Sequence, residues 1–462
     1  ADFDAYCAQI ERIQTELRTR YGADTNVVRQ MTGAEEDVIG EAVSAMGCIL
    51  VGQSVNIVQS KHKDAHTAEE LMPQLFGHWT TSLNRGGIVY LHTDFYTRTE
   101  LAADMLRAVV AAKVDNIAYI TPGAGREEEA ADRAASRYAI LSVQDVLRDT
   151  ATQYVYPVDM NTLPEEMRPY VRNEKLNGSA FSKEFLKRYI GAPEVGENDR
   201  MLGFSRNEIA LADKTGIVKS VADNTVFLSF DDWGSDDSIN HLLYVLRKHK
   251  VYGTFFVITW NIHNNPNLLR AIAAEGHEIG SHTDGHKPMT IQDERGRQIP
   301  VQNPEEYNED VRSSYEKLAA VVGDMKLPSG RYALTRMLRP PTLAVSRMGV
   351  TAILNNGFTY VVNGSGSTED YDAVSMESLV GILHNLTHEK DGSVKRGAIL
   401  VMHMSSTAAR TAAALDLLLT ANDSLPEGHP GKFKVGLLGD YLTGDYDQSM
   451  KQVKPTAGYQ LH

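Results

Sequence analysis

The chain has 462 residues, 42% of them hydrophobic and 23% charged, so it belongs to the ordinary globular class and exceeds the length that one hydrophobic core usually serves. A formal charge of −14 disfavours broad binding to nucleic acid or to an anionic membrane surface, because the acidic side chains would repel phosphates. No apolar run reaches the roughly 18 residues that a membrane-spanning helix needs. We therefore expect two domains, no nucleic-acid partner and no membrane span.

The first residue is Ala1, which suits a chain whose signal peptide has been removed and suits a trimmed chain equally well. A secreted or periplasmic location is our expectation. Cys7 and Cys48 are the only cysteines. They would form one disulfide in an oxidising compartment, or they are two free thiols.

The first half of the chain alternates between helical and extended patterns. A helix is expected at residues 2–21, where Tyr6, Ile10, Ile13 and Leu17 recur at three- and four-residue intervals. Further along, strands are expected at 48–58, 87–92 and 116–121, and helices at 65–76 and 98–112. This alternation predicts an α/β domain with a mainly parallel sheet, followed by a proline-rich linker.

The alternation restarts at residue 224 and is clearer there. Strands are expected at 226–230, 254–258, 358–362 and 398–403, and helices at 237–249, 267–275, 304–322, 342–356, 375–388 and 407–419. Repeated βα units of this length predict a distorted (β/α) barrel, in which functional residues lie at the carboxyl ends of the strands. The predicted domains are 1–220, an N-terminal α/β accessory domain with its linker, 221–445, the barrel, and 446–462, a C-terminal tail.

Two pairs of polar residues follow predicted strands in this region. Asp231 and Asp232 end an apolar strand, and His282 and His286 stand four residues apart after another. Either pair alone has an ordinary explanation, a solvated turn or a chance spacing. Together they supply carboxylate and imidazole ligands that suit zinc and leave positions open for water and substrate.

These blocks resemble the motifs of the polysaccharide deacetylases, the fourth carbohydrate-esterase family, which has a nodulation-type deacetylase homology domain. Residues 229–234 resemble the first motif, Thr-Phe-Asp-Asp-Gly, with Trp233 inserted before the glycine, and residues 282–286 match the second, His-Ser/Thr-x-x-His. Residues 339–341 resemble the third motif, and residues 399–403 the fifth. The fourth motif, Asp-x-x-Asp-Trp, is matched least well, by residues 367–371. The resemblance covers about half of the chain, from residue 224 to 441.

The resemblance implies a role for each matching residue. Asp231 would be the catalytic base, and Asp232, His282 and His286 would bind a divalent metal ion, with zinc the expected ion and cobalt or nickel the alternatives. Arg339 would keep Asp231 ionised through a charge-assisted hydrogen bond. His403 would be the general acid, oriented by the acid retained from the fourth motif, Asp370.

The substrate contacts that the resemblance implies are less regular. Thr342 stands where the third motif usually has tyrosine, and its backbone N–H would stabilise the oxyanion. Tyr371 and Val401 would line the slot for the acetyl methyl group, and Trp233 is a further candidate for contact with the substrate.

The expected function is therefore a metal-dependent hydrolase that removes N-acetyl groups from a glycan such as a chitin-type amino-sugar polymer. An O-acetyl esterase acting on acetylated xylan is the alternative within the same site chemistry. An alternative of another class is a carbohydrate-binding protein with a retired catalytic domain, suggested by the altered first, third and fourth motifs. Retention of every ligand, the base and the acid weighs against it, because a retired site has no need of buried charge. The sequence leaves the oligomeric state open.

Overall fold

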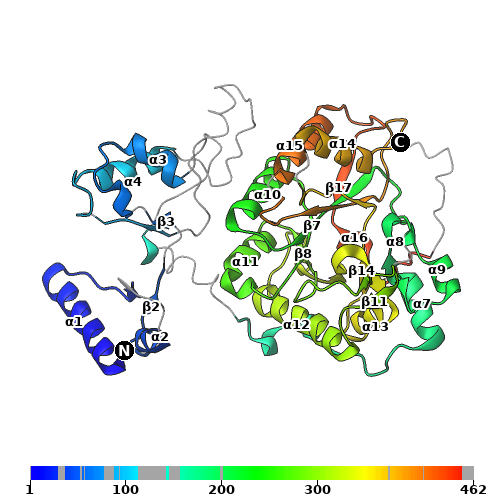
Figure 1. Ribbon diagram of the computed structural model, residues 1–462, viewed down its shortest axis with the longest axis horizontal. Helices are drawn as coiled ribbons and strands as arrows, with labels where there is room; N and C mark the ends of the chain where they lie inside the picture. The colour runs from blue at the N-terminus through cyan, green and yellow to red at the C-terminus, as the bar shows by residue number, and fades with distance from the viewer. Residues whose placement is uncertain are drawn as a thin grey trace. The chain divides into compact units, whose positions relative to one another are not determined.

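The computed structural model describes residues 2–29, 37–52, 55–56, 58–76, 88–92, 94–112, 142–144, 157–197, 201–372, 375–408 and 410–449. The chain forms two compact units, Ala1–Tyr154 and Val155–His462 (Figure 1). Each unit has buried hydrophobic clusters of its own.

The first unit consists of helices and two short pairs of parallel strands, β1 with β2 and β3 with β4. Its elements are α1 (Phe3–Tyr21), β1 (Val27–Val28), α2 (Asp37–Ala45), β2 (Ile49–Leu50), β3 (Val55–Asn56), η1 (Ser60–His62), α3 (Ala68–Phe76), β4 (Val89–Tyr90) and α4 (Leu101–Ala112). The strand predicted at 116–121 lies outside the described residues. Cys7 and Cys48 are free thiols, and Cys48 is buried beside Ile10.

The second unit is built on a curved sheet whose neighbouring strands are all parallel, in the order β15-β16-β7-β8-β9-β12-β14-β5, with β17 also paired to β7. The strands are β5 (Tyr189–Ile190), β7 (Thr225–Asp232), β8 (Thr254–Val257), β9 (Glu278–Ser281), β12 (Leu334–Leu338), β14 (Tyr360–Val362), β15 (Gly366–Ser367), β16 (Ile399–His403) and β17 (Lys434–Gly436). The predicted distorted (β/α) barrel is confirmed. The sheet curls without a ladder between its end strands β15 and β5 in the described residues.

Helices surround this sheet (Figure 1). They are α7 (Gly178–Arg188), α8 (Pro193–Glu197), α9 (Arg206–Leu211), α10 (Asp236–Lys248), α11 (Pro266–Ala274), α12 (Pro304–Val322), α13 (Arg347–Asn355), α14 (Met376–Thr387), α15 (Thr411–Ser424) and α16 (Leu438–Tyr441). Helix α12 has the predicted limits, since Asn303 caps it in a capping box with Glu306 and Pro304 occupies its first turn. The described residues contain no helix long and apolar enough to cross a bilayer.

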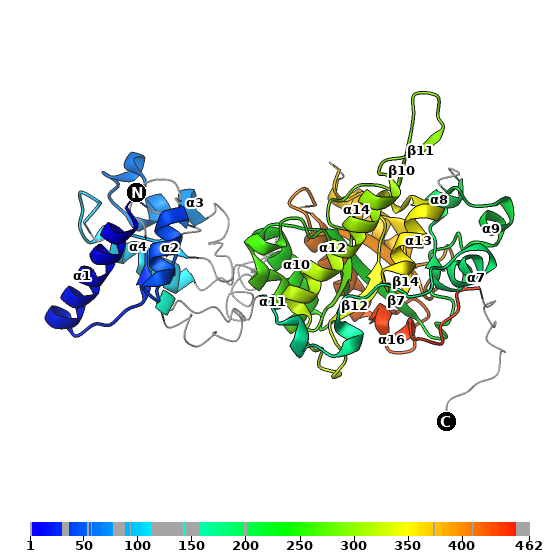
Figure 2. The same ribbon diagram turned by 90° about the horizontal axis from the view of Figure 1, so that it is seen from below.

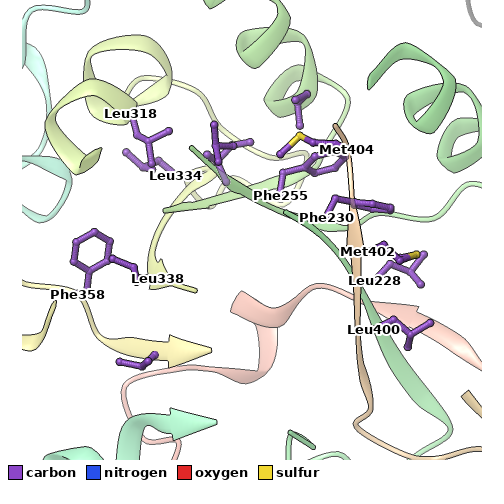
Figure 3. Packing of buried hydrophobic residues seen from close by; sticks show 14 of the residues in the cluster. Leu228, Phe230, Phe255, Leu318, Leu334, Leu338, Phe358, Leu400, Met402 and Met404 are labelled. Atoms are coloured by element: carbon purple, nitrogen blue, oxygen red, sulfur yellow. The ribbon is translucent and has the colours of Figure 1, made fainter. Parts of the chain in front are cut away.

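The strands place alternate side chains on opposite faces of the sheet. On β7, Leu228 and Phe230 point outward and pack with Phe255, Leu400 and residues of the surrounding helices (Figure 3). Phe227 points the other way, into a second cluster that fills the barrel interior. Each such fully buried side chain contributes roughly 1.5–3 kcal/mol. The same alternation aims Ser229 and Asp231 into the barrel.

Residues 157–220, which the sequence placed in the linker of the first domain, pack onto the second unit. Strand β5 extends the barrel sheet beside β14, and β6 (Met201–Leu202) pairs with β13 (Val345–Ser346). Tyr315 on α12 donates to the backbone carbonyl of Met167. The proline and polar residues of this stretch predict a linker. Its contacts were not predictable, because they are made with elements more than a hundred residues away in the sequence. The domain limits themselves stay a prediction.

The helix predicted at 342–356 is wrong in its first turn. Residues Pro341–Leu343 form a 3₁₀ turn, η6, then comes β13, and the helix α13 begins only at Arg347. Thr342 and Leu343 both have left-handed backbone conformations, with φ of 59° and 62°, which no α-helix of L-residues accommodates.

A two-stranded antiparallel hairpin follows the second histidine. It is formed by β10 (Thr290–Gln292) and β11 (Gln298–Pro300) and projects from the body of the unit (Figure 2).

Candidate metal and catalytic site

The carboxyl ends of the barrel strands bring the chemically active residues together. Asp231 and Asp232 end β7, His282 follows β9, Arg339 follows β12 and His403 ends β16. Because β16, β7, β8, β9 and β12 are neighbours in the sheet, residues that are up to 172 positions apart in sequence share one edge. The sequence predicted this edge as the site.

Three side chains could hold a metal ion. Ligand atoms of Asp232, His282 and His286 all lie within 4.8 Å of one another, with 3.7 Å from the Asp232 Oδ1 to the His282 Nε2 and 3.3 Å to the His286 Nε2. The buried Oδ1 of Asp232 has no hydrogen-bond partner. A buried carboxylate oxygen that faces two imidazole nitrogens without a hydrogen bond destabilises the fold, unless a cation binds to it. These residues therefore fit a divalent ion.

The environment of His282 keeps it ready to bind a cation. The Nδ1 of His282 lies 2.8 Å from the backbone carbonyl oxygen of Arg339, so it carries the proton and leaves the Nε2 lone pair free. Burial, with a contribution from neighbouring His286, lowers the pKa of His282 to about 3. The ring is therefore neutral, which metal ligation requires.

The turn that carries both histidines is fixed from behind by α12. Asp310 accepts hydrogen bonds from the backbone N–H groups of Asp284 (2.9 Å) and Gly285 (2.7 Å). The Asp284 carboxylate in turn binds the ammonium of Lys317 at 2.7 Å. This turn needs support, because His286 itself adopts a left-handed conformation with φ of 53°.

Asp231 is held by the fully buried guanidinium of Arg339. The Arg339 Nη1 donates to the Asp231 Oδ1 at 2.6 Å and to the Ser229 hydroxyl at 2.8 Å. The remaining donors of Arg339 reach the backbone carbonyls of Val362 and Asn363. Burial raises the pKa of Asp231, and the charge of Arg339 opposes that rise. The Oδ2 of Asp231 stays on the side of the metal ligands, 3.9 Å from His282.

His403 is paired with Asp370. The His403 Nδ1 lies 2.6 Å from the Asp370 Oδ1, and the His403 backbone N–H donates to Oδ2 at 3.0 Å. Thr411, at the start of α15, donates its hydroxyl to the same Oδ2. Burial lowers the pKa of His403, but the hydrogen bond that the ring donates to Asp370 and the charges of the nearby carboxylates together outweigh burial, so the net pKa is raised. The raised pKa favours the imidazolium form, which can donate a proton to a leaving group.

The predicted substrate residues have different surroundings. Tyr371 is exposed, and its ring meets the His403 ring edge-on at a centroid distance of 4.9 Å. Thr342 is exposed in its left-handed conformation. Val401 is buried two residues before His403 on the same face of β16. Trp233 is half-buried and packs against the hydrophobic core.

Backbone strain concentrates at this edge. Among the described residues, seven residues other than glycine have positive φ, and six of these belong to the carboxyl-end loops: Asp232, Thr283, His286, Thr342, Leu343 and Glu369. Such conformations cost on the order of 1–3 kcal/mol each and persist only where surrounding contacts over-determine them. Their clustering is typical of a functional site.

Four contributors were not singled out from the sequence: Ser229, Asn363, Thr411 and Asp310. Ser229 had a signal, because it lies two residues before Asp231 and so shares its face of β7. The others hold the site through contacts between distant elements, and no local pattern marks them.

Two histidines and a carboxylate surround a position that one cation could occupy, and a buried acid and a paired imidazole lie beside them. This arrangement at the carboxyl end of a (β/α) barrel fits a hydrolase type of site that could hold a metal ion. Residues 219–361 match the model of the polysaccharide deacetylase family. The match confirms, for these residues, the family resemblance that the sequence motifs predicted.

Two curated relatives illustrate the similarity. A chitooligosaccharide deacetylase of Rhizobium leguminosarum bv. trifolii is 33% identical over 97 residues, 21% of this chain and 44% of the relative. The peptidoglycan-N-acetylglucosamine deacetylase PgdA of Listeria monocytogenes serotype 1/2a (strain 10403S) is 26% identical over 271 residues, 59% of this chain and 46% of the relative. The chain thus spans less than half the length of these relatives. Among solved structures, the Bc1960 peptidoglycan N-acetylglucosamine deacetylase matches with a TM-score of 0.37 and 22% identity, over 47% of this chain and 87% of that one.

Proposed function

We propose that this protein hydrolyses N-acetyl groups of an amino-sugar glycan with the help of a divalent metal ion, zinc being the expected one. The observation that carries the proposal is the cluster of Asp232, His282 and His286, with the unpartnered Oδ1 of Asp232, beside the Asp231–Arg339 pair. The names of the relatives, which are deacetylases of chitooligosaccharides and of peptidoglycan, support an acetylated glycan as substrate.

An ion held by the three ligands would act as a Lewis acid toward the acetyl carbonyl and would activate water as the nucleophile. Asp231 accepts the proton of the attacking water, since its Oδ2 faces the ligands while Arg339 occupies its Oδ1. The oxyanion that develops on the acetyl carbonyl oxygen would be stabilised by the backbone N–H of Thr342, whose unusual backbone conformation supports such a role.

The leaving amine must gain a proton before the C–N bond breaks. His403 supplies it, because its Nδ1 is occupied by Asp370 and its Nε2 is the remaining donor position. Asp370 holds the ring in one orientation and stabilises its charged form, so it is a positioning residue. His403, held by Asp370, thus acts as the acid, and Asp231, held by Arg339, acts as the base.

The experiment is acetate release from N-acetylated amino-sugar oligosaccharides by the full-length chain, with and without a chelator. We expect release that stops when the metal is removed and returns when Zn²⁺ is added. Acetylated xylan assayed in parallel tests O-acetyl cleavage. A metal-loaded protein that binds the oligosaccharide and frees no acetate would instead indicate a binding protein with a retired site.

A further inference from the structure

Trp260 presents an unusually open aromatic surface. Its side chain is 61% exposed, whereas the other described tryptophan, Trp233, is half-buried against the core. A tryptophan contributes more apolar area than any other side chain, so leaving it in water forgoes a large stabilisation. The open indole offers a flat apolar face on which a ligand can pack.

The backbone of Trp260 is tied to the turn that carries the metal ligands. Its N–H donates to the carbonyl oxygen of Asp284 at 3.1 Å, between His282 and His286 in sequence. The preceding residue, Thr259, donates its N–H to Thr283 and its hydroxyl to the Asp284 carboxylate at 2.6 Å. Three hydrogen bonds therefore fix the position of Trp260 beside the site, while the ring itself remains open to solvent.

The order of strands places Trp260 and Tyr371 on either side of Asp231 and His403, while the two histidines of the metal cluster follow the next strand, β9. Tyr371 follows β15, His403 ends β16, Asp231 ends β7, and Trp260 follows β8, and these four strands are consecutive in the sheet. Three strand spacings of about 4.8 Å correspond to roughly 14 Å across this row. A chain longer than one sugar that presents its acetyl group between β16 and β7 can reach both aromatic residues.

We propose that Trp260 is a stacking platform for a second sugar of the same glycan chain, away from the one that is deacetylated. The inference rests on the proposed function and adds a requirement for chain length. Sugar rings offer apolar C–H faces that pack on an indole without any charge, which suits a neutral polymer. The aromatic ring would thereby select oligosaccharides over single sugars.

The test measures binding in the Asp231→Asn background of the full-length chain, so that substrate is not consumed. Chitooligosaccharides of one to six units are titrated, and intrinsic tryptophan fluorescence and heat are followed. We expect Trp260→Ala to weaken binding of the longer oligosaccharides by roughly 3- to 10-fold and to leave the single sugar unchanged, the loss of one aromatic contact. Trp260→Phe should restore most of the affinity.

A matched control is Tyr252→Ala, because Tyr252 is 42% exposed and precedes β8, at the opposite end of the same strand. It should leave binding of every oligosaccharide unchanged, and zinc affinity should be the same in all variants. The proposed role of Trp260 would be wrong if Trp260→Ala weakened the binding of short and long oligosaccharides equally, or left their affinity unchanged. It would also be wrong if the protein with Trp260 intact bound no oligosaccharide. Length-dependent binding through Trp260 without acetate release by the wild-type chain would contradict the proposed function and leave the platform standing.

Discussion

The two ends of the barrel each contain a buried carboxylate paired with an arginine, and they differ in what is left unpaired. At the amino end, Glu278 is fully buried, and both of its oxygens are used by Arg331, Thr254 and the backbone N–H of Gly439. At the carboxyl end, the Asp231–Arg339 pair lies beside Asp232, whose Oδ1 has no partner. Buried charge that is completely satisfied holds a fold together, whereas an unsatisfied lone pair beside two imidazoles is available for a ligand.

The amino end is also closed by close contact. A Cβ at Gly439 would come within 2.3 Å of the Glu278 Oε1, so only glycine lets the backbone donate to this carboxylate. Arg331 also forms an ion pair with Asp440 on α16, with 2.8 Å between the Arg331 Nη2 and the Asp440 Oδ1. Each of these charged groups has a partner within the fold, and we expect them to contribute to stability.

The largest effect is expected for Asp231→Asn. The amide keeps the shape but cannot accept the proton, so acetate release should fall by roughly 10²- to 10⁴-fold, the usual contribution of a general base. Zinc should still bind, because Asp232 and both histidines are untouched. Turnover close to that of the wild type would remove Asp231 from the mechanism.

The next effect concerns the support of the histidine turn. Asp310→Ala removes the acceptor for two backbone N–H groups and should weaken zinc binding by roughly 10- to 100-fold, as loss of a supporting contact does at metal sites. Zinc affinity by calorimetry is the readout, with Glu309→Ala as control because that neighbouring side chain is exposed. Equal affinities in both variants would show that the turn holds its shape without Asp310.

Glu278→Gln sharpens the contrast from the other end. The NH₂ group of the new amide would face Arg331 and the Gly439 N–H, which are donors as well, so hydrogen bonds would be lost. The free energy of unfolding should therefore drop by roughly 1–3 kcal/mol. The kcat of the folded protein should stay within about twofold, since Glu278 does not belong to the carboxyl end. A loss of kcat without a loss of stability in urea unfolding would contradict the division between the two ends.

The smallest effect comes from another fully partnered group, His249, which joins α10 to α15. Its Nε2 lies 2.6 Å from Asp416 and its Nδ1 2.6 Å from Asp423. Burial lowers the pKa of His249, but the hydrogen bonds to Asp416 and Asp423 and the charges of these carboxylates together outweigh burial, so the net pKa is raised. The stabilisation is therefore complete below the unfolded pKa of 6.5 and is lost as the pH rises through the higher folded value.

The measurement compares the free energies of unfolding of the wild type and His249→Gln at pH 6 and at pH 9. We expect a difference of roughly 1–2 kcal/mol at the lower pH that shrinks at the higher one. A difference that is constant with pH would mean that the imidazolium form contributes nothing.

The barrel and the cluster of acids and histidines could be predicted because their signals are local. Asp231 and Asp232 end an apolar run, and the spacing of His282 and His286 is visible within five residues. Helix α12 was predictable from its cap and its periodicity. The turn at Thr342 was missed because positive φ in a residue other than glycine is imposed by surrounding contacts rather than by the sequence.

The supporting residues were not predictable for a different reason. Asp310 acts on backbone groups 25 and 26 residues away, and Asn363 contributes its backbone carbonyl rather than its side chain. The openness of Trp260 likewise depends on how β8 and the histidine turn are joined. Such contacts join elements that are far apart in the sequence, and no local pattern specifies them.

The central claim is that Asp232, His282 and His286 bind one divalent ion at the carboxyl end. A crystal soaked with Zn²⁺ and measured at the zinc absorption edge tests it most directly. The account predicts one anomalous peak at roughly 2.0–2.2 Å from an oxygen of Asp232 and from the Nε2 atoms of both histidines, with a coordination position left open. A peak elsewhere, or none at these residues under saturating zinc, would contradict it.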